Sequence, residues 1–214
     1  MRLGSMGAAV AICGRDQAAL DSTLGELREA QVRAHAQMTD VTQANEVTEL
    51  IAKTEATLGA ISILVNNAGI GLFGPVHERS EEEWDKVLAT NLKSVFLVSR
   101  AVIPGMIRRN AGDIININSL AGRNAFAGGG IYCASKWGLQ GLTTCMAEDL
   151  RQYGIRVSSV LPGSVATGFG PSAARKTAAN ALAPEDVAHA VATLVTQGAQ
   201  SFISEVQLRP LRKA

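Results

Sequence analysis

Short β-rich runs alternate with longer helical stretches along this chain, and this alternation most constrains its fold. Six runs have the apolar, β-branched character of buried strands: Ala8–Cys13, Val32–Met38, Ser62–Asn66, Asp113–Asn118, Arg156–Leu161 and Phe202–Leu208. Helical stretches separate them: Asp16–Glu29, Gln43–Leu58, Glu81–Asn110, Gly130–Tyr153 and a last one from Pro184 that ends before Gly198. Strands separated by helices predict an α/β protein with a doubly wound parallel sheet, covered on both faces. No linker interrupts the pattern, so residues 1–214 are expected to form a single domain.

Composition narrows the class of protein. Hydrophobic residues make up 47% of the 214 residues and charged residues 18%, which is typical of a soluble globular protein. A net charge of +1 gives no attraction to nucleic acid or to an anionic membrane. No apolar run is expected to be long enough to span a membrane. The three cysteines form no Cys-x-x-Cys motif and no Cys/His cluster. We therefore expect reduced thiols, a cytoplasmic protein and no bound metal.

Local signals set the expected helix ends. Ser80 and Glu83 form a capping box at the start of the long helix, and Pro104 should kink or shorten it. Gly154 is expected to end the helix before it, and Pro184 to begin the last one.

Unusual residues follow three successive strands. Asn66–Gly69 follows one strand, Ser119 the next, and Pro162 with Gly163 a third. Each could be an ordinary strand-to-helix turn, where such residues are common. Because ligands gather at the carboxyl ends of parallel strands, three such turns together predict a binding site.

The stretch from Ser119 to Lys136 carries residues suited to proton transfer. Tyr132 and Lys136 are four residues apart at the start of a helix, so they lie on one face. A phenol has a pKa of about 10, and a nearby ammonium would lower it by favouring the phenolate. With the Ser119 hydroxyl beside it, the pair could protonate a carbonyl or deprotonate an alcohol. On its own, Tyr-x-x-x-Lys is a weak signal.

A glycine motif at Gly69–Gly74 spells Gly-x-Gly-x-x-Gly but lacks the structural context of a phosphate site. A helix should begin inside such a motif, whereas Pro75 follows it and the next helix starts at Glu81. We interpret it as a loop. The first residues, MRLGSMGAAV, resemble the last turn of a helix that leads into a strand, with no phosphate loop ahead of it.

The combined motifs resemble the short-chain dehydrogenase/reductase family over about Gly7 to Leu208. They are the NNAG run at Asn66–Gly69, Asn91, Ser119, the YCASK run at Tyr132–Lys136 and the PGSVAT run at Pro162–Thr167. The resemblance implies a Rossmann-like, three-layer α/β/α fold and an oxidoreductase.

The resemblance also implies a role for each matching residue. Tyr132 would be the acid/base, Lys136 would lower its pKa and bind the nicotinamide ribose, and Ser119 would orient the substrate carbonyl. Asn91 would help to hold a water linking Lys136 to solvent. The cofactor would also contact Asp40, Val41, Asn66, Asn67, Ala68, Gly69, Pro162, Gly163, Val165 and Thr167. Without the family, Asp40 could equally cap the next helix, Asn91 could tie backbone together and Thr167 could be a turn residue.

The expected cofactor is NADP(H) in preference to NAD(H). NAD-dependent enzymes of this fold place a carboxylate at the end of the second strand, where it accepts hydrogen bonds from the ribose. That position holds Gly14 here, followed by Arg15, whose guanidinium could pair with a 2′-phosphate. Arg15 could also be a solvated loop cation, and Asp16 weighs against the assignment.

The family's TGxxxGxG loop, its first strand and most of its first helix have no counterpart in the sequence. A start codon assigned too late, a shortened chain and a genuine variant could each account for this. The first strand would stand between Ala8–Cys13 and Ser62–Asn66, so two open edges, weak nucleotide binding and low stability are expected.

The substrate is left open. The segment Gly168–Ala183 and the loop Asn124–Phe126 select no substrate, although a 3-oxoacyl-[acyl-carrier-protein] reductase is similar enough to suggest a carbonyl, alcohol or acyl thioester. A non-catalytic protein that senses NADP(H) or binds a partner is the alternative. The helices Glu81–Asn110 and Gly130–Tyr153 are expected to form a homodimer or homotetramer face, unless their apolar stripes only cover the sheet.

Overall fold

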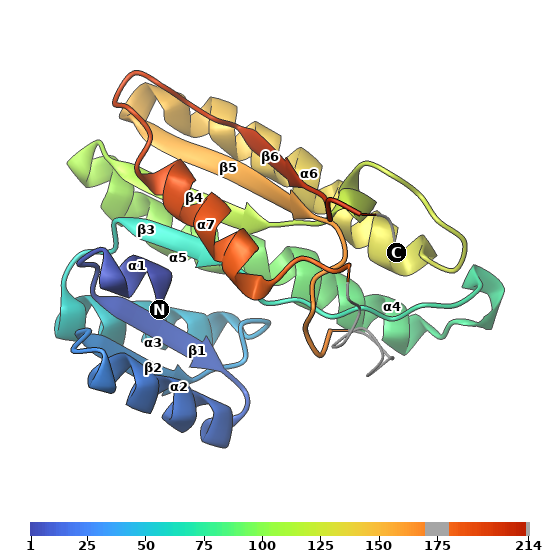
Figure 1. The fold of residues 1–214 in the computed structure, drawn as a ribbon, viewed down its shortest axis with the longest axis horizontal. Coiled ribbons are helices and arrows are strands. Elements are labelled where there is room, and N and C mark those ends of the chain that lie inside the picture. Colours follow the sequence, from blue (N-terminus) through green and yellow to red (C-terminus); the bar gives the residue numbers. More distant parts are fainter. Residues whose placement is uncertain (170–179, 213–214) are drawn as a thin grey trace.

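A computed structural model describes residues 1–169 and 180–212 (Figure 1). The strands are β1 (Val10–Gly14), β2 (Ala34–Met38), β3 (Ile63–Asn66), β4 (Gly112–Ile117), β5 (Ile155–Pro162) and β6 (Glu205–Leu208). The α-helices are α1 (Arg2–Ser5), α2 (Gln17–Glu29), α3 (Ala44–Leu58), α4 (Glu81–Leu88), α5 (Ser94–Arg109), α6 (Gly130–Leu150) and α7 (Pro184–Val195). Every predicted strand and helix is present, with ends within a few residues of those expected.

All strand pairs are parallel, which confirms the predicted sheet type. Within the described residues, however, the strands form two sheets, β1–β2 and β3–β4–β5–β6, instead of one. β1 and β3 therefore have one hydrogen-bonded neighbour each. Figure 1 shows them running in the same direction, and residues of both line one cavity of about 1530 Å³.

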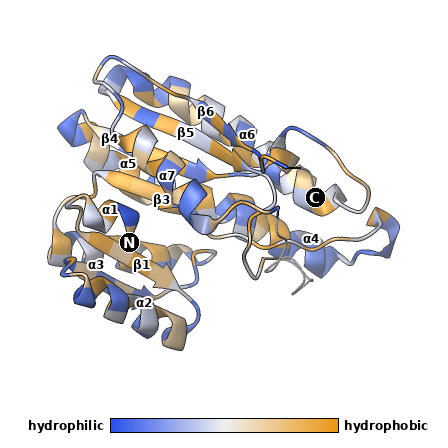
Figure 2. Ribbon diagram, viewed as in Figure 1, coloured by the Kyte–Doolittle hydropathy of each residue, from blue (hydrophilic) through white to orange (hydrophobic). Residues whose placement is uncertain are grey.

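The larger sheet has a packed core on both faces. Ile114 on β4 packs with Met106 of α5 and Leu150 of α6, whereas the next residue, Ile115, packs with Val191 and other side chains of α7. Successive strand residues point to opposite faces, so two neighbouring isoleucines serve two cores. Figure 2 shows hydrophobic residues along β3 and in parts of β4 and β5.

Local chemistry fixes the helix ends as predicted. Ser80 and Glu83 exchange the two hydrogen bonds of a capping box at the start of α4. Pro184 occupies the first turn of α7. Gly154, at φ +65°, follows the short 3-10 turn Arg151–Tyr153 in the left-handed conformation that glycine adopts without strain.

The long helix differs from its prediction. It continues through Pro104 to Arg109, so the expected shortening at the proline is wrong. Its irregular part is a π-helical turn at Ala89–Lys93, which joins α4 to α5. The helix from Glu81 to Arg109 is also long and apolar enough to cross a membrane, contrary to the expectation from sequence. Half of its most apolar stretch is buried inside the protein, as in a core helix.

Candidate active site

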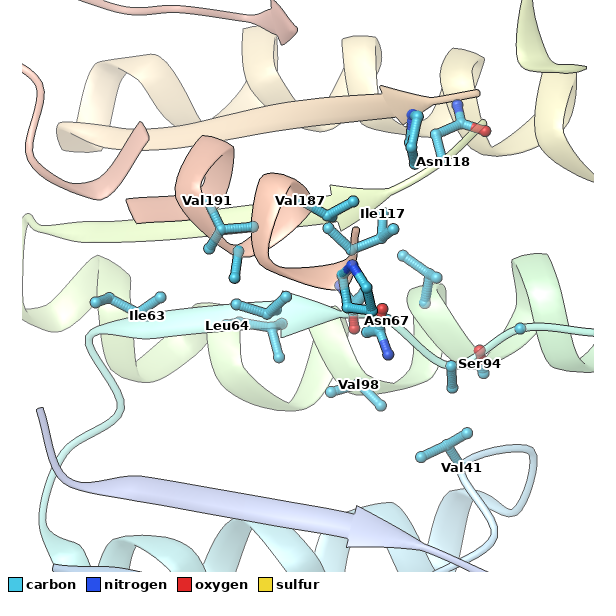
Figure 3. A pocket seen from close by; sticks show the side chains of 18 of the residues that line it. Val41, Ile63, Leu64, Asn67, Ser94, Val98, Ile117, Asn118, Val187 and Val191 are labelled. Atoms are coloured by element: carbon cyan, nitrogen blue, oxygen red, sulfur yellow. The ribbon is translucent and has the colours of Figure 1, made fainter. Parts of the chain in front are cut away.

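The cavity between β1 and β3 continues to the carboxyl ends of β3, β4 and β5 (Figure 3). In the gap between β1 and β3 the walls of the cavity are apolar. They include Ile63 and Leu64 on β3, Val98 on α5, and Val187 and Val191 on α7. Polar and ionisable side chains gather at its other end, where Asn118 and Ser119 follow β4. The arrangement matches the general location of ligand sites in parallel sheets.

Helix α6 brings Tyr132 and Lys136 to this cavity. The two residues are only 7% and 4% exposed, and both line its wall. The Lys136 Nζ lies 5.9 Å from the centre of the Tyr132 ring and donates a 3.0 Å hydrogen bond to the carbonyl oxygen of Ile117. Burial lowers the pKa of Lys136 from 10.5 to about 8. The lysine is therefore held beside the phenol near the end of β4.

Ser119 is positioned by the turn that follows β4. It caps the 3-10 turn Leu120–Gly122, and its Oγ accepts a 3.1 Å hydrogen bond from the backbone N–H of Ala121. That contact uses an acceptor site of the hydroxyl, so its proton can still be donated to a ligand oxygen. Ser119 lines the same cavity as Tyr132 and Lys136.

Asn91 lies in the π-helical turn and is fully buried. Its Oδ1 accepts from the N–H of Ile70 at 2.8 Å, and its Nδ2 donates to the Ile70 carbonyl at 2.9 Å and to the Ser135 Oγ at 3.0 Å. Asn91 therefore ties the loop after β3 to the helix that carries Tyr132. It does not itself line the cavity. π-Helical turns are rare and often occur at functional sites.

The other expected cofactor residues separate into two groups. The residues that line the cavity are Val41, Asn66, Asn67, Ala68, Gly69, Pro162, Gly163, Val165 and Thr167. Arg15 and Asp40 lie beyond the ends of β1 and β2 and do not line it. The pKa of Asp40 is lowered, first by the backbone N–H of Thr42, then by its hydroxyl, and also by the charge of Arg15.

Two buried polar networks were not predicted. In the first, Asn66 Nδ2 donates to Asn116 Oδ1 at 2.8 Å, and Asn116 Nδ2 donates to Thr143 Oγ1 at 2.9 Å. This network connects β3, β4 and α6 beneath the site. The signal was present, because an asparagine within an otherwise apolar strand needs buried partners, but the sequence does not show which residues supply them.

The second network lies behind Ser119. Gln140 Oε1 accepts from Asn118 Nδ2 and from Ser159 Oγ, both at 2.9 Å, while its Nε2 donates to Glu205 at 3.0 Å. Arg123 also pairs with Glu205 at 2.7 Å. Burial raises the pKa of Glu205, but hydrogen bonds from Arg123 and Gln207 outweigh it, so the pKa is lowered overall. The network braces the strand end and the loop on either side of Ser119.

The aromatic lining of the site was also missed. Phe73, Phe126 and Phe169 line the cavity, and two of these rings contact Tyr132. The segments Asn124–Phe126 and Gly168–Ala183, from which the sequence predicts no substrate, contribute Phe126 and Phe169 to this lining. Residues 170–179 of the second segment lie outside the described residues. Throughout the described ranges, no group of His, Cys, Asp and Glu could hold a metal ion.

Comparison with known proteins identifies the family. Residues 1–179 match the short chain dehydrogenase family. The chain is 36% identical over 208 residues to 2-(S)-hydroxypropyl-CoM dehydrogenase 3 of Xanthobacter autotrophicus, an alignment that covers 90% of this chain and 82% of the relative.

Solved structures show the same fold. A metagenomic short-chain oxidoreductase in complex with NADP is 42% identical, with a TM-score of 0.86 over 99% of this chain and 90% of that one. A variant of actinorhodin polyketide ketoreductase with NADPH is 34% identical, with a TM-score of 0.89 over 97% and 88%. The chain therefore belongs to the short-chain dehydrogenase/reductase family and is an NAD(P)-dependent oxidoreductase.

Proposed function

We propose that the protein transfers a hydride between NADP(H) and a ketone or secondary alcohol, with Tyr132 as the acid/base. The observation that carries this proposal is the convergence of Tyr132, Lys136 and Ser119 on one cavity. Ser119 and Thr167 contribute hydroxyl groups to the lining of this cavity, and Lys136 contributes an ammonium. These hydrogen-bond donors fit the nicotinamide end of the cofactor. When bound, the dinucleotide supplies the hydride.

The protein's own residues would manage the proton. In the reducing direction the Tyr132 hydroxyl gives its proton to the carbonyl oxygen, while the Ser119 hydroxyl donates a hydrogen bond to the same oxygen. The Lys136 ammonium stabilises the tyrosinate that remains. Asn91 is a positioning residue, since it holds the loop at Ile70 against α6 through three hydrogen bonds.

The preference for NADP(H) over NAD(H) rests on Arg15. The residue follows β1 directly, and the end of that strand holds Gly14 instead of a carboxylate. A guanidinium there can pair with a 2′-phosphate. The two similar structures described above hold NADP and NADPH, which also supports this choice. Among substrates, likeness to a polyketide ketoreductase favours a 3-oxoacyl thioester as one candidate ketone.

The catalytic proposal is tested with the two tyrosines of the chain. Tyr132→Phe should lower kcat for NADPH-dependent ketone reduction by roughly 10²- to 10⁴-fold, because it removes the general acid. Tyr153→Phe is the matched control, because Tyr153 lies in the 3-10 turn after α6 and does not line the cavity. Equal activity of Tyr132→Phe and the unaltered protein would contradict the role. NADPH binding without turnover of any ketone would favour the sensing alternative.

We also propose that a further strand with a glycine-rich phosphate loop belongs between β1 and β3. The support is that the strands form two separate sheets, with an apolar cavity lying between β1 and β3. β1 and β3 run in the same direction (Figure 1), and each has one edge without a strand partner in the described chain. Such edges are normally paired or covered. The relatives named above also extend beyond their matched regions.

This proposal predicts that nucleotide affinity is limited by the gap. A chain extended at its N-terminus by a strand, a glycine-rich turn and a helix should bind NADPH at least about tenfold more tightly than residues 1–214, a change of about 1.4 kcal/mol. The control is the same extension with a proline at the centre of the added strand, which cannot pair on both sides. Equal affinity of all three proteins in a fluorescence titration would refute the proposal.

We propose, finally, that copies of the chain associate through the long helices. Trp84 on α4 and Trp137 on α6 are 43% and 53% exposed, which is unusual for tryptophan on a helix without a partner. Sedimentation velocity of the unaltered protein and of Trp137→Glu tests the idea. We expect a dimer or tetramer that the substitution dissociates, and a monomer in both samples would exclude this face.

A further inference from the structure

Three phenylalanines from separate loops form a cluster beside the Tyr132 ring. Phe73 meets it edge-on, with ring centres 5.4 Å apart, and Phe169 lies tilted against it at 5.8 Å. Phe126 extends the group through Phe73, at 5.9 Å. These separations are those of favourable aromatic pairs. Together we call Phe73, Phe126 and Phe169 the aromatic wall.

The backbone is shaped to seat the aromatic wall. A Cβ added to Gly71 would come within 2.8 Å of both Phe73 and Phe169, and one added to Gly129 would come within 2.6 Å of Phe126. The Gly74 N–H donates a 2.8 Å hydrogen bond to the Gly128 carbonyl oxygen. This bond joins the loop of Phe73 to the loop of Phe126, so the two loops are held side by side.

The aromatic wall is partly exposed to solvent. Phe126 is 48% exposed although it lines the cavity that holds Tyr132 and Ser119. An aromatic face left partly uncovered beside a catalytic hydroxyl offers stacking area to a bound molecule. If the rings served only to shield Tyr132 from water, the outermost ring would not need to be aromatic.

We infer that the aromatic wall selects ketones or secondary alcohols that carry a planar, apolar group next to the reacting carbon. This inference rests on the proposed function, because it places the reacting carbon beside Tyr132 and Ser119. Phe126 is then a specificity-determining residue. Its ring would stack on the planar group, and Phe73 would meet its edge.

Two ketones of equal carbon number test the inference, acetophenone and 2-octanone, each reduced with NADPH. The variant is Phe126→Leu, which stays apolar but loses the ring. The control is Phe96→Leu on α5, whose side chain is also 48% exposed and lies outside the cavity. We expect a preference for acetophenone in kcat/KM that falls about 2- to 12-fold in Phe126→Leu, mainly through KM, and stays unchanged in Phe96→Leu.

Several outcomes would overturn the inference. The unaltered protein could have a higher kcat/KM for 2-octanone than for acetophenone, or a higher kcat/KM for saturated 3-oxoacyl thioesters than for both ketones. The Phe126→Leu and Phe96→Leu variants could also show the same preference. If no ketone is reduced, the proposed function fails separately, and binding of acetophenone to Tyr132→Phe is measured by ligand-observed NMR. Weaker binding when Phe126→Leu is added would support the aromatic wall, and unchanged binding would refute it.

Discussion

The β1–β2 half and the β3–β6 half of the molecule are built from the same kind of parallel strand, but they are buried very differently. Seven of the eight residues of β5 are buried, whereas no residue of β1 or β2 is. The contrast also holds at the gap, where three of the four residues of β3 are only partly buried. A strand becomes fully buried only with neighbours on both sides and helices on both faces.

The residues proposed for catalysis lie in only one of these halves. Tyr132, Lys136, Ser119 and Asn91 all belong to the well-buried half, and the two polar networks lie within it. The β1–β2 half carries Arg15, expected at the 2′-phosphate, together with Asp40 and Val41, which the resemblance assigns to the adenine. The residues proposed for proton transfer are therefore held independently of β1 and β2, whereas the residues expected at the adenine and the 2′-phosphate belong to the less buried half.

The largest predicted effect concerns Lys136, which lies in the well-buried half. Its folded pKa of about 8 lies below the usual 10.5, so between these values the unfolded chain keeps a proton that the folded chain has lost. The free energy of unfolding should therefore rise with pH across this window, by about 3 kcal/mol relative to Lys136→Met, which lacks the group. Urea denaturation from pH 7 to 10.5 measures the difference.

Lys53 is the control for that experiment. It lies on α3 beside β1 and β2, and 55% of its side chain is exposed. Lys53→Met, which removes an exposed ammonium paired with Glu49 on the same helix, should show no comparable rise relative to the unaltered protein. A constant or falling difference between the unaltered protein and Lys136→Met would show that the lysine is not desolvated in the folded state.

Hydrogen exchange should divide the molecule at the gap. We expect the amides of Ile12 and Gln37, in β1 and β2, to exchange at least about 100-fold faster than those of Ile115 and Val160, in β4 and β5, because local opening is easiest where few apolar contacts hold a strand. Residue-resolved exchange followed by NMR measures these rates. Equal protection would mean that both halves open together, and the comparison would fail.

The smallest predicted effect compares two amide side chains on strands. Asn116→Ala should lower the free energy of unfolding by about 1–3 kcal/mol, because it removes two buried hydrogen bonds, one from Asn66 Nδ2 and one to Thr143 Oγ1. Gln37→Ala on β2 should change it by less than about 0.5 kcal/mol, since the buried Oε1 of Gln37 accepts no hydrogen bond among the described residues. Thermal and urea unfolding compare the two. Similar losses would remove the distinction between the halves.

Local rules were enough to predict the elements. Periodicity placed the strands and helices, and the capping signals at Ser80, Pro184 and Gly154 identified helix ends that the structure confirms. The expected shortening at Pro104 was wrong, because a helix held against a sheet by its apolar face can keep a proline that would break an isolated helix.

Other features depend on pairings between residues far apart in the chain. Asn116 and Thr143 are separated by 27 positions, and Gln140 and Glu205 by 65, so no local pattern reveals that they meet. The aromatic wall escaped prediction for the same reason, since its three rings come from three loops. The family resemblance indicated which residues to examine, but only the fold shows what surrounds them.

The π-helical turn at Ala89–Lys93 has a consequence for engineering. Each residue advances an α-helix by about 100°, so deleting one residue there to restore regular winding would rotate α4 by about that angle relative to α5. Trp84 would then face a different direction, and the Asn91 side chain could no longer span both backbone atoms of Ile70. Shortening the chain in this stretch should thus be far less tolerated than shortening a surface loop.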